Sequence, residues 1–217
     1  MPDLIVDRPP GSARTAAPGL SVLLTHGAGG TAAGAGLAAL AGGLAAAGHL
    51  VARFNLPYRE LGRATPPPAE RSVPGYAEAA AQARGSLDAR PWALGGKSYG
   101  GRVASLAVAG GLEAAGLVFY GYPLHPPGKP EALRVAHWPS IAVPSVFLEG
   151  TEDPFCDLRL LRANLDRLGG PATLHVVEGG DHSLRVRSAR RGEGAVLADL
   201  AAVVAEWLDA LPGQSAA

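Results

Sequence analysis

Residues 92–102, with the sequence WALGGKSYGGR, constrain the fold of this chain more than any other segment. The apolar run 92–94 meets two glycines, and an alanine-rich stretch of helical character follows Gly101. This order predicts a strand, a sharp turn and a helix. Residues 96–100 fit the pattern G-x-S-x-G, in which a serine on a strained turn exposes its hydroxyl above a sheet. We expect glycine at 96 and 100 because a Cβ there would meet the backbone of a neighbouring strand or helix.

Apolar runs alternate with helical segments along the whole chain. Strands are expected at residues 4–6, 20–25, 50–55, 92–94, 116–120, 144–149 and 172–177, and helices at 32–47, 76–89, after the turn at 98, at 156–168 and at 195–211. The alternation predicts an α/β fold, with a mostly parallel sheet of about six or seven strands and helices on both faces. We expect one domain over residues 1–217 with a disordered tail at 212–217. The irregular segments 56–74 and 121–139 are too short to form a large lid.

Charge and cysteine content narrow the function classes. Lys and Arg number 19, as do Asp and Glu, so no basic field recruits nucleic acid or an anionic membrane. The sequence shows neither a signal-peptide pattern nor an apolar segment of the ~20 residues that cross a bilayer. The single cysteine, Cys156, excludes an internal disulfide, in agreement with a reducing compartment. We expect a cytoplasmic protein that acts on small molecules.

Chemically suggestive side chains follow the predicted strands. Ser98, Asp153 and His182 each lie at the carboxyl end of a strand, where parallel sheets gather functional groups. A serine hydroxyl becomes a nucleophile when an imidazole takes its proton, and a carboxylate fixes the tautomer of that imidazole. The order serine, aspartate, histidine along the chain is the order found in α/β-hydrolases. The pattern therefore favours a serine hydrolase.

Five segments together carry a resemblance to a known family. They are HGAGG (26–30), GGKSYGGR (95–102), GYPLHPPGKP (121–130), GTEDPF (150–155) and GGDHS (179–183). The chain resembles small α/β-hydrolases of the dienelactone-hydrolase-like and serine-esterase group, from about residue 20 to the C-terminal helix. The resemblance implies the α/β-hydrolase fold and the hydrolysis of small carboxylic esters or thioesters through an acyl-enzyme, without metal or cofactor.

The resemblance also implies roles for single residues. Ser98 would be the nucleophile, Asp153 the acid and His182 the base. The backbone N–H groups of Ala28 and Tyr99 would form the oxyanion hole. The enzymes that give dienelactone hydrolase its name carry cysteine at the position of Ser98, so lactone specificity is not transferred.

Several assignments stay open at the level of the sequence. Asp153 could merely cap the following helix, and rivals for the acid are Glu149, Glu152, Asp157, Glu178 and, least favoured, Asp181. His26 either braces the oxyanion loop or simply ends a strand. Lys97 and Arg102 could hold the turn, bind a substrate carboxylate or face solvent. An open cleft is expected to be lined by Tyr58, Tyr122, Leu124 and Trp138, with His26 and Lys97 nearby.

Other residues have plainer interpretations. We expect His125 and His137 to be solvated, and no pair of histidines has metal-ligand spacing. Cys156 is expected to be a buried packing residue rather than a reactive thiol.

Two other function classes compete with hydrolysis. Gly27, Gly29 and Ala32 fit a loose dinucleotide pattern, and Arg53 at the end of the next strand would suit a 2′-phosphate. The second competitor is an interaction module that keeps the hydrolase shape without turnover.

Overall fold

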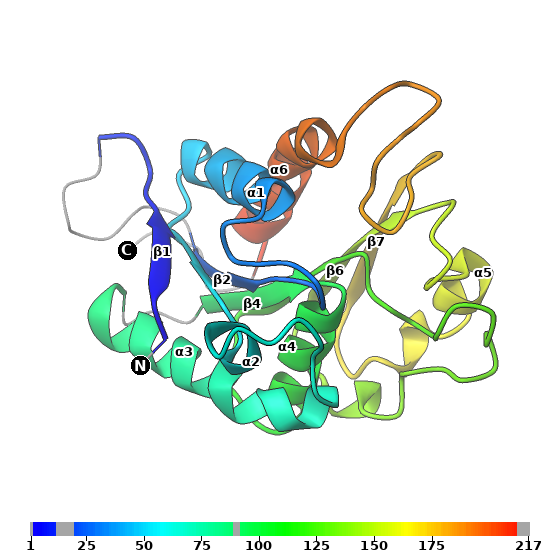
Figure 1. Ribbon diagram of the computed structural model, residues 1–217, viewed down its shortest axis with the longest axis horizontal. Helices are drawn as coiled ribbons and strands as arrows, with labels where there is room; N and C mark the ends of the chain where they lie inside the picture. The colour runs from blue at the N-terminus through cyan, green and yellow to red at the C-terminus, as the bar shows by residue number, and fades with distance from the viewer. Residues whose placement is uncertain (1, 12–19, 89–91, 212–217) are drawn as a thin grey trace.

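A mostly parallel sheet organises the computed structural model, which describes residues 2–11, 20–88 and 92–211 (Figure 1). The seven strands follow the order β1-β3-β2-β4-β5-β6-β7. They are β1 (Leu4–Asp7), β2 (Ser21–Thr25), β3 (Val51–Phe54), β4 (Trp92–Lys97), β5 (Gly116–Tyr120), β6 (Ser145–Gly150) and β7 (Ala172–Val177). Strand β1 pairs antiparallel with β3 at one edge, and every other pairing is parallel. The predicted fold class is confirmed; the tail at 212–217 lies outside the described residues.

Helices cover both faces of the sheet. Figure 1 shows α1 (Ala35–Ala46) and α6 (Glu193–Asp209) side by side on one face, and α3 (Val73–Ser86) and α4 (Tyr99–Ala109) on the other. The shorter elements are α2 (Pro57–Glu60), α5 (Leu158–Arg162), η1 (Ala69–Ser72), η2 (Trp138–Ser140) and η3 (Leu165–Arg167). Within the described ranges, no helix is both long enough and apolar enough to cross a bilayer.

Strand β2 illustrates why the apolar runs are continuous. All its residues are buried. Leu23 packs into the apolar cluster on the α3 and α4 face, whereas Val22 and Leu24 pack into the cluster on the α1 and α6 face. Because alternate side chains point to opposite faces and both faces are covered by helices, no position in the strand needs to be polar.

Small residues bring α1 and α6 together. A Cβ added to Gly43 would lie 2.4 Å from the Cβ of Ala201, so the two helices approach more closely than ordinary side chains allow. The glycines of α1 cost helix propensity. Packing against α6 and the sheet offsets that cost.

Three segments depart most clearly from the sequence prediction. Strand β4 continues through both glycines to Lys97 because their backbones still pair with β2 and β5. The expected loop 56–74 contains α2, η1 and the start of α3, and a proline lies in the first turn of both α2 and α3, where it is tolerated. The expected helix 156–168 divides into α5 and η3. Between them the side chain of Asn164 donates to Leu160 O at 2.8 Å and competes with the backbone.

Tyr76 ties α3 to the strand that leads into the sharp turn. Its hydroxyl accepts the N–H of Gly95 at 2.8 Å and lies 2.9 Å from Gly95 O and 3.1 Å from Leu23 O. The residue is fully buried, and this burial raises the pKa of the phenol. The neutral hydroxyl therefore satisfies backbone groups that water cannot reach.

Replacing this hydroxyl should destabilise the fold. Tyr76→Phe leaves the buried N–H of Gly95 without its acceptor, so we expect the free energy of unfolding to fall by about 1–3 kcal/mol in urea titrations. The matched variant Tyr99→Phe, whose phenol is only partly buried, should lose less. Equal losses in the two variants would contradict this account of Tyr76.

Candidate active site

Ser98 occupies a strained position between β4 and α4. Its backbone has φ 49° and ψ −115°, a left-handed conformation that residues with a Cβ rarely adopt. The N–H of Ser98 donates to Tyr120 O at 2.9 Å. A Cβ on Gly96 would lie 2.5 Å from Thr25 O, and one on Gly100 would lie 2.5 Å from His26 O. The expectation that both glycines permit close backbone contacts is confirmed.

A hydrogen-bonded chain links Ser98, His182 and Asp153. Nε2 of His182 lies 2.8 Å from Ser98 Oγ, and Nδ1 lies 2.7 Å from Asp153 Oδ2. Because an ionised carboxylate can only accept, Nδ1 carries the proton and Nε2 accepts the serine hydroxyl. The three residues follow β4, β6 and β7. The structure thus brings together side chains that are 84 and 29 positions apart.

Two contacts orient the acid and the imidazole. Oδ1 of Asp153 accepts the N–H of Phe155 at 2.7 Å, which turns Oδ2 toward His182. The Asp153 side chain is fully buried. The ring of Phe155 lies over the imidazole, with centroids 4.3 Å apart and planes tilted by 31°. Phe155 was not among the residues expected at the site, although it lies only two residues after Asp153.

The rival carboxylates are engaged elsewhere or exposed. Asp157 caps α5 by accepting the N–H groups of Arg159 and Leu160. Asp181 accepts from Ser183 and Arg185. Three other carboxylates complete the set, with Glu149 buried and Glu152 and Glu178 exposed. Among the described residues, the hydrogen bonds place Asp153 alone against His182.

The loop 26–30 passes directly beside the serine. A Cβ on Gly27 would lie 3.5 Å from Ser98 Cβ. His26 holds this loop, since Nε2 accepts the N–H of Leu56 at 3.1 Å and Nδ1 donates to Gly27 O at 2.8 Å. Burial lowers the pKa of His26, which favours the neutral ring that these bonds require. The geometry matches the bracing interpretation rather than proton transfer.

The residues of the two candidate oxyanion amides lie near the serine, because Ala28 belongs to the loop beside it and Tyr99 follows it in the chain. The hydroxyl of Tyr58 donates to Ala28 O at 2.7 Å and fixes the loop on its far side. Tyr99 is the first residue of α4, where a helix leaves its N–H groups without intrahelical partners. The N–H groups of Ala28 and Tyr99 thus remain the candidates for an oxyanion hole.

The predicted lining of the cleft is wrong at four positions, Tyr58, Tyr122, Leu124 and Trp138. Tyr122, Leu124 and Trp138 have no exposed surface and belong to the apolar cluster under the sheet. Tyr122 donates from its hydroxyl to Arg134 O at 3.0 Å. The segment 121–139 folds back onto the sheet, so its aromatic side chains fill the core. Tyr58 is likewise buried, and it contacts the loop rather than solvent.

The expectation of solvated histidines is wrong for His125. That residue is buried, and its Nε2 accepts the N–H of Asp157 at 3.0 Å. His137 is half-buried and lies 2.8 Å from Ser105 Oγ, and burial lowers the pKa of its ring to about 4. Both rings therefore serve the packing of the segment 121–139.

Arg53 on β3 and Arg102 on α4 both form bonds within the fold. Arg53 bonds Asp7 at 2.8 Å and Ala32 O at 2.5 Å, so its guanidinium is not offered to a nucleotide phosphate. Arg102 pairs with Glu70 at 2.9 Å. The dinucleotide interpretation loses the residue on which it depended.

A cavity of about 500 Å³ lies beside the turn that carries Asp153. Its lining residues are His125, Pro130, Thr151, Asp153, Pro154, Cys156, Asp157, Leu158 and Arg159. It adjoins the hydrogen-bonded chain at Asp153, whereas Ser98 and His182 do not line it.

Comparison with known proteins decides the family. A family profile described as an alpha/beta hydrolase domain matches residues 18–209. The chain belongs to this alpha/beta hydrolase family. The resemblance expected from the sequence motifs is thereby confirmed.

Solved structures share the fold of this alpha/beta hydrolase chain. A serine hydrolase homologue from Coxiella burnetii has a TM-score of 0.72 at 17% identity, covering 94% of this chain and 90% of that one. A serine hydrolase without a lid from Xanthomonas campestris has a TM-score of 0.70 at 21% identity, with coverages of 97% and 91%. A dienelactone hydrolase from Anabaena variabilis has a TM-score of 0.70 at 17% identity, with coverages of 96% and 91%.

Glu149 lies behind the acid turn and is fully buried. Its Oε1 accepts the N–H of Tyr122 at 2.6 Å. Burial, and then the neighbouring charge of Asp153, raise the pKa of this carboxyl well above 4.5. The thiol of Cys156 lies beside the same group, and burial raises its pKa as well, which agrees with an unreactive packing cysteine. The hydrolase chain thus buries a carboxyl that favours its neutral form.

Removing the titration of Glu149 should stabilise the chain at high pH. Because the folded-state pKa is raised, the neutral carboxyl supports folding fully below about pH 4.5, and this support is lost as pH rises through the folded pKa. Glu149→Gln keeps the acceptor for Tyr122 N–H without the charge. We expect it to raise the free energy of unfolding at pH 8 and to change it much less at pH 5. An equal difference at both pH values in urea titrations would contradict the assignment.

Proposed function

We propose that this chain is a serine hydrolase that cleaves small carboxylic esters or thioesters through an acyl-enzyme. The observation that carries the proposal is the hydrogen-bonded chain from Ser98 through His182 to Asp153, built on a strained turn at the end of β4. A hydroxyl held in this way can be deprotonated as it attacks a carbonyl carbon.

In the proposed reaction, Ser98 Oγ attacks the carbonyl carbon and passes its proton to His182 Nε2. Asp153 stabilises the imidazolium through Nδ1–H. The carbonyl oxygen becomes an oxyanion and accepts hydrogen bonds from the N–H groups of Ala28 and Tyr99. As the C–O or C–S bond breaks, the imidazolium protonates the leaving group. Water then attacks the acyl-enzyme by the same route, and the acid is released with Ser98 restored.

Small substrates fit the surroundings of the serine better than large ones. The segments 56–74 and 121–139 pack onto the body of the molecule and form no large lid over the serine. Structural neighbours include a protein from Rhodothermus marinus whose domain is described as an esterase domain. We infer that the substrates are soluble small-molecule esters in the cytoplasm.

Covalent labelling tests the nucleophile. A fluorescent fluorophosphonate should label the wild-type chain and, because the hydroxyl is the reacting group, leave Ser98→Ala unlabelled. Hydrolysis of p-nitrophenyl acetate should fall by about 10⁴- to 10⁶-fold in the same variant. The variant Ser105→Ala, which alters a buried serine on α4, is the control and should be labelled. Failure of the wild type to react with either reagent would favour the non-catalytic interaction module.

Kinetics of two carboxyl variants test the acid. Asp153→Asn removes the charge that stabilises the imidazolium and the tautomer, so we expect kcat to fall by about 10²- to 10⁴-fold. Glu149→Gln removes a carboxyl nearby that does not contact His182, and kcat should change by less than about threefold. The reverse ranking, measured as kcat on p-nitrophenyl esters, would transfer the role of acid to Glu149.

A further inference from the structure

The neighbours of the serine and the histidine are bonded to each other. Lys97 precedes Ser98, and Ser183 follows His182. Nζ of Lys97 donates to Ser183 Oγ at 2.7 Å across 86 positions of the chain. This bond joins the same two segments as the bond between Ser98 and His182, so it fixes one segment against the other.

Ser183 is held at each of its polar groups. Its N–H donates to Asp181 Oδ1 at 2.8 Å, and its hydroxyl oxygen accepts from Lys97. Its carbonyl oxygen lies 3.0 Å from the hydroxyl of Tyr120, whose single proton it shares with the carboxylate of Glu193. The contacts come from β4, β5 and the loop itself. A residue fixed in this way restricts the backbone that carries His182.

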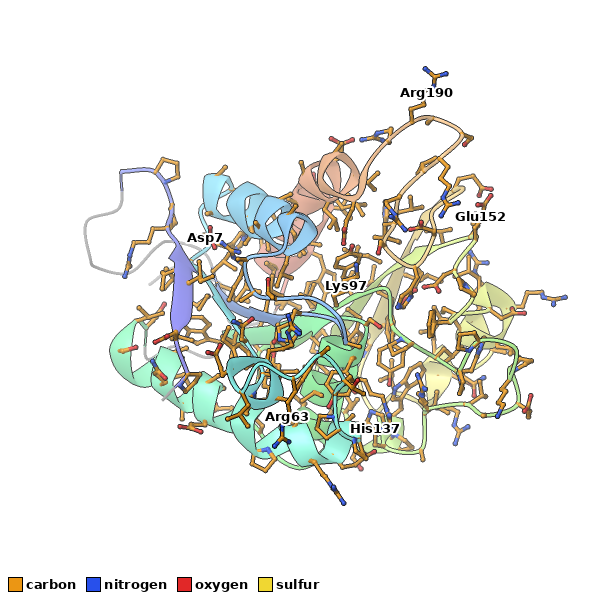
Figure 2. All side chains as sticks on the ribbon, in the orientation of Figure 1. Asp7, Arg63, Lys97, His137, Glu152 and Arg190 are labelled. Carbon is orange, nitrogen blue, oxygen red and sulfur yellow. The ribbon has the colours of Figure 1, made fainter. Side chains whose placement is uncertain are left out.

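Glu193, the first residue of α6, completes the arrangement. Its Oε1 accepts from Lys97 Nζ at 2.7 Å and from the hydroxyl of Tyr120. A Cβ on Gly36 would lie 2.5 Å from the same oxygen, so the carboxylate is packed against the first turn of α1. The side chains of Lys97 and Glu193 are 21% and 28% exposed. Figure 2 shows Lys97 near the centre of the molecule, whereas Arg190 projects from its edge.

We propose that Lys97 and Glu193 are positioning residues, which hold the loop of His182 beside Ser98 and cancel each other's charge at the imidazole. The inference rests on the proposed function. Lys97 supplies the bond to Ser183. Glu193 fixes the ammonium of Lys97 and offsets its positive charge. Without Glu193, that charge would oppose the transfer of a proton to the imidazole of His182.

The other charges around the imidazole are already paired or fixed. Asp153 faces Nδ1 from the turn after β6, and Asp181 in the same segment as His182 is paired with Arg185. Glu149 lies buried behind the acid turn and favours its neutral form. Tyr120 on β5 favours its neutral form, since burial raises the pKa of its phenol. In the proposal, changing Lys97 or Glu193 alone therefore alters the charge near His182 by one unit.

The test compares charge removal from the two ends of the pair. Lys97→Met leaves Glu193 unbalanced and favours the imidazolium, so the acidic limb of the kcat/KM profile should move to higher pH. Glu193→Gln leaves Lys97 unbalanced and should move the limb to lower pH. We expect the acidic limb to move by about 0.3–1 pH unit, in opposite directions in the two variants. In the double variant the limb should lie at nearly the same pH as in the wild type.

Two further variants separate position from charge. Ser183→Ala removes the acceptor for Lys97 without changing any charge, so kcat on p-nitrophenyl acetate should fall by about tenfold with KM within threefold and the limb unmoved. Asp199→Asn, which removes a charge from an exposed residue of α6 that pairs with Arg191 just before the helix, is the matched control and should change neither quantity. Unchanged kcat in Ser183→Ala, or limbs that move the same way in Lys97→Met and Glu193→Gln, would overturn the proposal.

A measurement without turnover keeps this test distinct from that of the proposed function. NMR titration of the imidazole in ¹⁵N-histidine-labelled full-length protein, with His182→Gln to assign the signal, follows the ring directly. Opposite displacements of the His182 midpoint in the two charge variants support the pair even where the wild type hydrolyses no ester. Glu193→Gln is nearly isosteric and still offers Lys97 an oxygen, so it measures the charge effect if Lys97→Met does not fold. A His182 midpoint that is the same in Glu193→Gln and wild type counts against the pair.

Discussion

The site depends on backbone contacts that leave no room for a side chain. Where β4 turns into α4, Gly96 lies against Thr25 O and Gly100 against His26 O. These contacts press the turn of Ser98 against the end of β2 and the loop 26–30. The left-handed backbone of Ser98 costs free energy. The sheet hydrogen bonds on both sides of β4 offset that cost.

Around this turn, the structure controls position and charge together. The carboxylate of Asp153 is aimed by a backbone N–H and buried, which strengthens its bond to His182. The ring of Phe155 covers one face of the imidazole. Lys97, which precedes Ser98, and Glu193 on α6 form an ion pair, so one positive and one negative charge lie side by side. Asp153 and Phe155 thus hold the imidazole beside Ser98.

Much of this could be predicted because parallel sheets place strand ends together. The alternation of apolar runs with helical segments predicts the layers, and the positions of Ser98, Asp153 and His182 after strands predict that they meet. The prediction fails for Tyr122 and Leu124. Aromatic and apolar residues in a proline-rich segment can line a cleft or fill a core, and the choice depends on which way the segment folds over the sheet.

By itself, the sequence determined the α/β layers, the sharp turn at Ser98 and the family, because these follow from local periodicity and from short motifs. Only the tertiary structure decided which groups surround His182. Glu193 lies 96 positions from Lys97 and belongs to no motif. Contacts of this kind form when helix packing brings distant side chains together. They cannot be predicted from the sequence, because a bond between two distant residues leaves no pattern in local spacing.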